Sequence, residues 1–271
     1  MTLSPAILGQ GLLKSVARQI EDGGFDTRFQ PIVDHAPNGE QIIGFEALTR
    51  FPGFGSEQAF STIAAAPEEF QASVDEALAI AAIREAVRAG VGSNTELHIN
   101  LAPATLARNP ARFAEIGADP LCVVPRKRKG PVPRIVYEIT EHPSTSTLEA
   151  LVEARNLLGE ARLPVALDDL GAGQANLMLW ARLQPDILKI DKAFTQAFRA
   201  NHRAALNAVL EGVIRLSCDA RLGSPRVIAE GVETPEHLRM LESHGVRESQ
   251  GFYWAYPAGA DEGGLAPLDR R

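Results

Sequence analysis

Short runs of β-branched and apolar residues alternate along the chain with longer segments in which apolar residues recur at helical spacing. Eight runs are predicted to be strands: Arg28–Val33, Ile42–Leu48, Glu96–Leu101, Arg134–Thr140, Val165–Leu170, Ile187–Asp191, Arg226–Val232 and Ser249–Trp254. Six segments are predicted to be helices: Gln71–Ala89, Ala104–Ile116, Thr145–Ala161, Gln174–Arg182, Thr195–Leu216 and Pro235–Ser243. This alternation predicts an α/β protein, a (β/α)₈ TIM-like barrel.

The connection between the first two predicted strands is too short for a helical crossover. It is the eight-residue segment DHAPNGEQ, which contains Pro37, Asn38 and Gly39. A crossover between parallel strands takes about a dozen residues or more, whereas these residue types suit a hairpin turn. We therefore predict an antiparallel first strand pair, unlike that of a regular barrel.

The barrel pattern covers most of the 271 residues without a long linker, so we predict a single domain for residues 1–271. We expect an N-terminal helix at about 5–22, the barrel at about 27–257 and a C-terminal tail at 258–271. The net charge of −7 argues against a general nucleic-acid-binding protein. Cys122 and Cys218 lie far apart in no metal-binding spacing, which is typical of a cytoplasmic protein. No membrane segment is expected, because the longest apolar runs are too short to span a bilayer.

Polar side chains gather where the predicted strands end, and in a barrel these ends meet at one rim. They are Glu46, Arg50, Asn100, Glu138, Glu141, Asp168, Asp169, Lys189, Asp191, Glu230, Glu233 and Gln250. Buried carboxylates are costly unless they are paired or coordinated, and one lysine and one arginine cannot offset so many. Hard divalent cations can, so the pattern favours a two-metal site for in-line displacement at phosphorus.

Other polar features are assigned structural roles. His98 is expected to face the opposite side of its strand from Asn100 and to pack as a structural residue. The four cations Arg126–Lys129 are expected in a solvated loop, with a loop that contacts phosphate or a partner as the alternative. Neither a P-loop nor a G-x-S-x-G elbow occurs, and GAGQAN lacks the third glycine of a dinucleotide fingerprint.

Eight motifs, in order, resemble those of the EAL-domain cyclic di-GMP phosphodiesterase family. FEALTRF resembles the EAL signature, and the others are FQPIVD, INLAP, YEITE, LDDLGAG, DILKIDKAF, VIAEGVET and QGFYWAYP, from about Arg28 to Pro257. The resemblance implies a barrel with one antiparallel strand, in agreement with the short first connection.

The resemblance also implies roles for individual residues. Two Mg²⁺ or Mn²⁺ ions would be held by Glu46, Asn100, Glu138, Asp168 and Asp169, with Glu230 at the second metal or its water. Lys189, Glu230 and Gln250 are the implied catalytic residues around the attacking water, and Arg50 and Gln30 are implied in substrate binding. Glu141, Asp191 and Glu233 are implied in supporting roles.

The activity that the resemblance implies is hydrolysis of cyclic di-GMP to linear pGpG by metal-activated water. The chain departs from the family pattern after DDLGAG, where Gln174, Ala175 and Asn176 replace Tyr-Ser-Ser. One alternative is therefore a catalytically weak domain that acts as a cyclic di-GMP receptor through protein contacts. A regulator that binds no nucleotide and an unrelated metal-dependent barrel are further alternatives. A homodimer is expected, a regulatory protein partner is possible, and no nucleic-acid polymer is expected as a partner.

Overall fold

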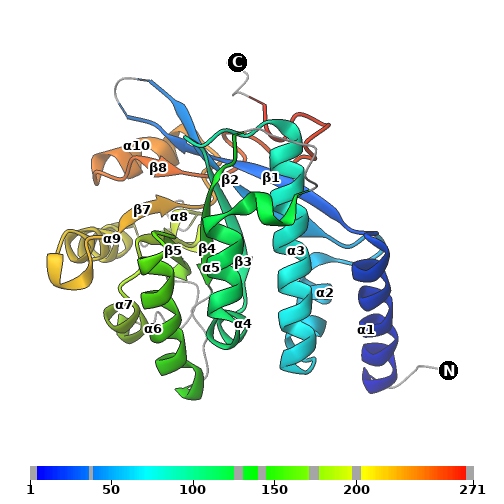
Figure 1. Ribbon diagram of the computed structural model, residues 1–271. Coiled ribbons are helices and arrows are strands. Elements are labelled where there is room, and N and C mark those ends of the chain that lie inside the picture. The colour runs from blue at the N-terminus through cyan, green and yellow to red at the C-terminus, as the bar shows by residue number, and fades with distance from the viewer. Residues whose placement is uncertain are drawn as a thin grey trace.

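The predicted eight-stranded barrel is confirmed by the computed structural model, which describes residues 5–36, 39–124, 131–139, 145–170, 177–196 and 203–266. The strands form one closed barrel in chain order (Figure 1). They are β1 Asp26–Asp34, β2 Gln41–Arg50, β3 Glu96–Leu101, β4 Arg134–Ile139, β5 Val165–Leu170, β6 Ile187–Ile190, β7 Arg226–Ala229 and β8 Glu248–Ser249.

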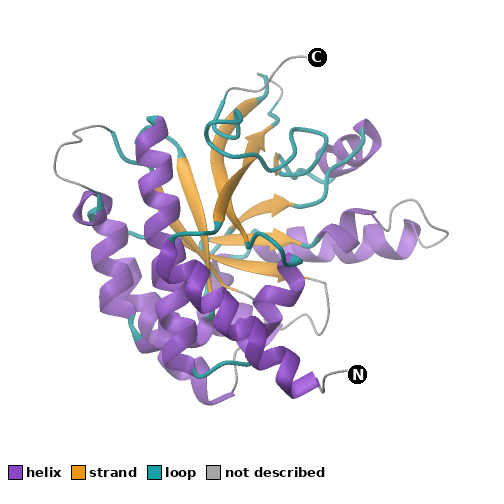
Figure 2. Cartoon of the chain, turned by 90° about the vertical axis from the view of Figure 1, so that its right-hand side faces the viewer, coloured by secondary structure: helices purple, strands orange, loops and turns teal. Residues whose placement is uncertain are grey.

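The helices lie outside the barrel and cover the outward faces of its strands (Figure 2). They are α1 Pro5–Asp22, α2 Ser56–Ala64, α3 Glu68–Ala89, α4 Pro103–Arg108, α5 Pro110–Ala118, α6 Thr145–Glu160, α7 Leu177–Leu183, α8 Lys192–Gln196, α9 Arg203–Ser217 and α10 Pro235–Ser243, with short 3₁₀ turns η1 Pro120–Val123 and η3 Ala220–Leu222. The helices α1, α2 and α3 contact one another and lie near the N-terminus (Figure 1).

The antiparallel start of the barrel is also confirmed. Strand β1 is antiparallel to β2, with Gln30 opposite Glu46, and it is antiparallel to β8, with Val33 opposite Ser249. The remaining neighbours, from β2 to β8, pair in parallel. The carboxyl ends of β2 to β8 therefore point the same way, so residues near these ends meet at one rim.

Alternation along each strand decides which side chains enter the barrel. Ile32, Val136, Ala166, Ile187 and Ile228 come from five strands and form one buried cluster in the interior. The residues between them, such as Leu167 and Leu188, belong to the larger core under the helices. Because side chains alternate with a period of two, residues two positions after the interior ones also face inward. These residues are Glu138, Asp168, Lys189 and Glu230.

Two local predictions were wrong. The helix expected over Ala104–Ile116 is divided into α4 and α5 at Asn109, which has the non-helical angles φ −125° and ψ 44°. Pro110 causes the division, because proline restricts the residue before it and has no N–H to continue the helix. Helix α2 was not predicted at all and fills part of the segment between β2 and α3.

The last two strands are shorter than expected. The strand predicted to reach Val232 ends at Ala229, and the one predicted to reach Trp254 ends at Ser249. The chain leaves the sheet at Gly251, which has φ +156°. A Cβ atom there would lie 2.1 Å from the carbonyl oxygen of Val232, so only glycine allows the two backbones to approach this closely.

Candidate functional site

A fully buried lysine lies among four carboxylates at the rim of the barrel. The Nζ atom of Lys189 on β6 lies 3.2 Å from Glu46 Oε2 on β2, 2.9 Å from Glu138 Oε2 on β4 and 3.3 Å from Asp168 Oδ1 on β5. It lies 2.7 Å from Oε1 of Glu230, which directly follows β7. Four predicted carboxylates and the predicted lysine are thus brought together from the ends of five strands, β2, β4, β5, β6 and β7.

This cluster holds more negative charge than one lysine can balance. An ammonium group has three N–H donors, so it cannot donate to four carboxylates at once. Among the described residues, Asp168 Oδ1 is buried and accepts no hydrogen bond. Burial raises the pKa of Asp168 well above its usual range, and the carboxylates of Glu230 and Glu138 add to this effect. Burial likewise raises the pKa of Glu230 to about 7 despite the nearby Lys189.

Two members of the cluster are held in their charged forms. Burial would raise the pKa of Glu138, but Lys189 and a hydrogen bond from His98 outweigh it and hold the pKa at about 2. Burial would lower the pKa of Lys189, but Asp168 and Glu138 lead the carboxylates that raise it well above the usual range. The lysine is therefore a permanent cation at the centre of the site.

Two predicted amides complete the cluster through hydrogen bonds to Glu46. Asn100 donates from Nδ2 to Glu46 Oε1 over 2.9 Å. Gln250 donates from Nε2 to Glu46 Oε2 over 2.5 Å and to Glu230 Oε1 over 3.1 Å. The close approach at Gly251 is what brings Gln250 beside the residues that follow β7.

The neighbouring aspartates both reach the rim. Asp168 faces inward by alternation, whereas Asp169 has φ +59°, and this left-handed backbone turns its side chain from the outward direction. One carboxylate oxygen each from Asp168, Asp169 and Glu230 lie within 4.8 Å of one another. Carboxylate and amide oxygens are the ligands of hard divalent cations. The surplus charge, and the Asp168 oxygen that accepts no hydrogen bond, fit such ions.

The interpretation of His98 as a residue facing away from Asn100 was wrong. Positions two apart share a face, and His98 lies fully buried inside the barrel. Its Nδ1 atom is 2.7 Å from Glu138 Oε1 and its Nε2 atom is 3.3 Å from Glu96 Oε2. Burial would lower the pKa of His98, but the hydrogen bonds with Glu138 and Glu96 raise it.

The other predicted residues lie around the cluster rather than in it. Gln30 donates from Nε2 to the carbonyl of Ala255 and so ties β1 to the segment after β8. Asp191 accepts from the backbone N–H of Ala193 and caps the start of α8. Glu233 is exposed and accepts from Gln196. Glu141, Gln174–Asn176 and Arg126–Lys129 lie outside the described residues.

A pocket of about 960 Å³ opens beside the cluster, between the rim and the helices α2 and α3. Its lining includes Arg50, Asn100, Asp168 and Asp169 among the predicted residues. Sequence reasoning missed Phe60 and Asp75, which line it from α2 and α3. Burial raises the pKa of Asp75 to about 6, although its carboxylate accepts a hydrogen bond from Ala102 N–H. A pocket of this size, with polar groups on one side, suits a small-molecule ligand.

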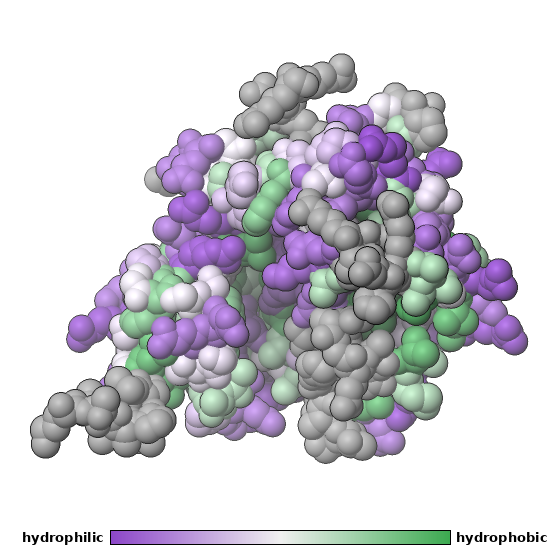
Figure 3. All heavy atoms as spheres, turned by 180° about the vertical axis from the view of Figure 1, so that it is seen from behind, coloured by the Kyte–Doolittle hydropathy of each residue, from purple (hydrophilic) through white to green (hydrophobic). Residues whose placement is uncertain are grey.

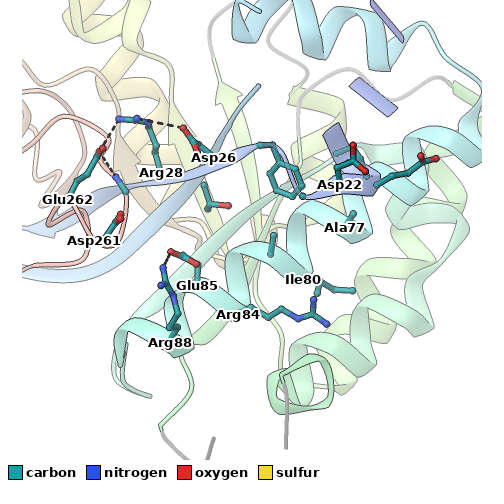
Figure 4. A pocket seen from close by; sticks show the side chains of 17 residues that line it. Asp22, Asp26, Arg28, Ala77, Ile80, Arg84, Glu85, Arg88, Asp261 and Glu262 are labelled. Atoms are coloured by element: carbon teal, nitrogen blue, oxygen red, sulfur yellow. Dashed lines mark hydrogen bonds and ion pairs between the residues drawn. The ribbon is translucent and has the colours of Figure 1, made fainter. Parts of the chain in front are cut away.

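A second pocket, of about 880 Å³, lies between α1, β1, α3 and the C-terminal segment (Figure 4). Three ion pairs lie among its charged side chains: Arg28 with Asp26, Arg28 with Glu262, and Arg88 with Glu85. It contains none of the predicted site residues.

The rear face of the molecule is hydrophilic over much of its described surface, with apolar side chains in scattered groups (Figure 3). Among the described residues, no helix combines the length and the apolar composition needed to cross a bilayer.

The fold and the rim cluster define a member of a known class. The EAL domain family matches residues 13–257, so this chain belongs to the EAL domain family. The blue light- and temperature-regulated antirepressor BluF of Escherichia coli (strain K12) is 31% identical over 236 residues, which are 84% of this chain and 53% of BluF. The probable cyclic di-GMP phosphodiesterase PdeD of the same organism is 35% identical over 127 residues, which are 47% of this chain and 23% of PdeD.

A solved structure with the same architecture is BlrP1 of Klebsiella pneumoniae in a complex with manganese and cyclic di-GMP. It superposes with a TM-score of 0.70 at 29% sequence identity and covers 86% of this chain and 56% of the BlrP1 chain. BlrP1 has also been solved with calcium and cyclic di-GMP. This chain therefore spans about half the length of BluF and of BlrP1.

Proposed function

We propose that this protein is a metal-dependent phosphodiesterase that hydrolyses cyclic di-GMP to linear pGpG. The observation that carries the proposal is the rim cluster, in which the buried Lys189 lies among four carboxylates. Membership of the EAL domain family and the similarity to BlrP1, solved with manganese and cyclic di-GMP, support this choice of chemistry.

The residues of the rim fit two Mg²⁺ or Mn²⁺ ions. The proposed ligands are Glu46, Asn100, Glu138, Asp168, Asp169 and Glu230. When bound, the ions would lower the pKa of an attacking water and neutralise charge on the phosphoryl oxygens. They would also offset the burial and the repulsion that raise the pKa of Asp168 and Glu230.

The chain's own residues supply positioning around that chemistry. Lys189 draws the carboxylates of four strands together and holds a fixed positive charge at the centre of the site, where it would stabilise charge that develops on the phosphate. Gln250 holds Glu46 and Glu230 toward the same point through its amide nitrogen. Arg50 lines the adjacent pocket, where its guanidinium would bind a phosphate oxygen of the substrate.

We also propose a homodimer formed through α7 and α9. Leu177, Met178, Val209 and Leu216 are large apolar side chains exposed on these helices, and Met178 is 67% exposed. Leu177, Val209 and Leu216 border an apolar pocket of about 270 Å³. Sedimentation of the protein and of a Met178→Asp variant tests this, because a charge in an apolar interface should dissociate the dimer.

We place the protein in the cytoplasm, since Cys122 and Cys218 are both free.

The test of the proposed activity is turnover of cyclic di-GMP by the purified protein, with the products separated by chromatography. We expect pGpG with Mg²⁺ or Mn²⁺, none with EDTA, and little with Ca²⁺, which is larger and less strict in its geometry. Glu46→Gln should lose turnover, whereas the control Glu85→Gln, in the second pocket, should retain it. Absence of turnover with retained nucleotide binding would overturn the enzyme proposal and favour a cyclic di-GMP receptor.

A further inference from the structure

A chain of charged side chains crosses the barrel interior from the rim to the opposite end. It begins at Glu138, continues through His98 to Glu96, and ends at Arg226 and Glu248. Arg226 donates to both oxygens of Glu96, over 2.8 Å and 3.1 Å. It also donates to both oxygens of Glu248. Each link is a direct contact between side chains, so the position of the rim carboxylate depends on the far end of the barrel.

The lower members of this chain come from the first residues of three strands. Glu96 begins β3, Arg226 begins β7 and Glu248 begins β8, so they meet at the end of the barrel away from the rim. His98 is the next inward-facing residue of β3 after Glu96, and Asn100 is the one after that. The histidine ring fills the distance between the two ends, and its side chain has no exposed surface.

We propose that His98 is a positioning residue that fixes the orientation of Glu138 for metal binding. Among the described residues, His98 Nδ1 provides the hydrogen bond to Glu138 Oε1, while Lys189 contacts Oε2. A carboxylate held at one oxygen cannot rotate about its terminal bond, so the other oxygen stays directed at the rim. Partners of this kind are worth roughly 10- to 100-fold in metal affinity. The inference rests on the proposed function, because it requires that Glu138 binds a metal ion.

Two substitutions separate positioning from simple packing. In His98→Asn the amide nitrogen replaces Nδ1 and can still donate to Glu138. In His98→Gln the amide nitrogen reaches the place of Nε2 and faces Glu96 instead. His35→Gln is the matched control, because His35 is also buried but contacts Glu242 and stacks on Trp254 outside the rim cluster.

The readout is the Kd for Mn²⁺, measured by calorimetry without substrate on variants whose folding is checked by circular dichroism. We expect His98→Gln to bind Mn²⁺ about 10- to 100-fold more weakly, with His98→Asn and His35→Gln close to the wild type. Equal affinity in His98→Gln and the wild type, or equal weakening in His98→Asn and His98→Gln, would overturn the inference alone. A wild-type protein that binds no Mn²⁺ would overturn the proposed function and this inference with it.

Discussion

The two ends of the barrel interior hold charged side chains in opposite balance. At the far end, which we call the floor, Arg226 lies between Glu96 and Glu248 and donates to both. Burial would raise the pKa of Glu96, but His98 and Arg226 hold it at about 2. At the rim, burial and mutual repulsion raise the pKa of Asp168 well above its usual range.

The difference in charge balance indicates that the floor stabilises the fold and that the rim does not. Both ends are made by the same strands and the same alternation, so the backbone does not separate them. They differ in the ratio of cations to carboxylates. The floor is balanced within the chain, whereas the rim is balanced only if positive charge arrives from outside. Perturbed carboxylates of this kind are typical of functional sites.

The largest expected effect comes from removing one rim charge. Asp168→Asn keeps the shape of the side chain but should lower cyclic di-GMP turnover on the order of 1000-fold, since the site loses a charged group at the reacting centre. Without metal, the same variant should unfold at a higher denaturant concentration than the wild type, because the cost of burying this carboxylate and the repulsion at the rim are both removed. Chemical unfolding in EDTA measures this. Lower stability than the wild type would show that the rim is not strained.

Removing the rim cation should cause the next largest effect, a loss of stability. Lys189→Met leaves four carboxylates without their buried partner and should lower the unfolding free energy by about 3–5 kcal/mol in EDTA. Mn²⁺ should restore stability more in this variant than in the wild type. The control is Lys192→Met, an exposed lysine on α8. Equal unfolding midpoints for the two variants would contradict the role given to Lys189.

Asp75, in the wall of the pocket beside the rim, should make the stability of the protein depend on pH. Because burial raises its folded-state pKa from 3.8 to about 6, the native state holds the proton more tightly than the unfolded state. Stability should therefore fall as the pH rises from about 4 to about 6, and the cost should be fully present above that. Asp75→Asn should be more stable than the wild type by up to about 3 kcal/mol at pH 7.5. The two proteins should converge near pH 4, and an advantage that persists there would reject this explanation.

The smallest effect is expected at the floor, with the opposite sign to the rim. Glu96→Gln removes a charge that faces Arg226 and His98, so it should lower the unfolding free energy by about 1–2 kcal/mol. The effect is limited because Arg226 keeps Glu248 and its side chain is 38% exposed to screening solvent. Unfolding in urea measures it beside Asp168→Asn. If both substitutions change the unfolding free energy in the same direction, the rim and the floor do not differ in charge balance as described.

Local patterns were sufficient to predict the barrel and most of the rim. Alternating strand and helix periods gave the closed sheet, and the short connection before Gln41 gave the antiparallel start. The floor could not be found in this way, because Glu96, Arg226 and Glu248 become neighbours only when distant strands meet. The inward direction of His98 follows from the period of two, but the sequence prediction placed it on the opposite face of its strand.

Closure of the sheet between its first and last strands has a consequence for synthesis of the protein. Strand β8 pairs with β1, and the hydrogen bond from Gln250 to Glu46 joins residues 204 positions apart. Contacts of such long range form late, because the intervening chain must be ordered first. A ribosome-bound chain that has not yet released β8 therefore cannot complete the rim. The rim would therefore be completed only after β8 has left the ribosome, and the exposed edges of β1 and β7 would make the preceding interval the one that most needs a chaperone.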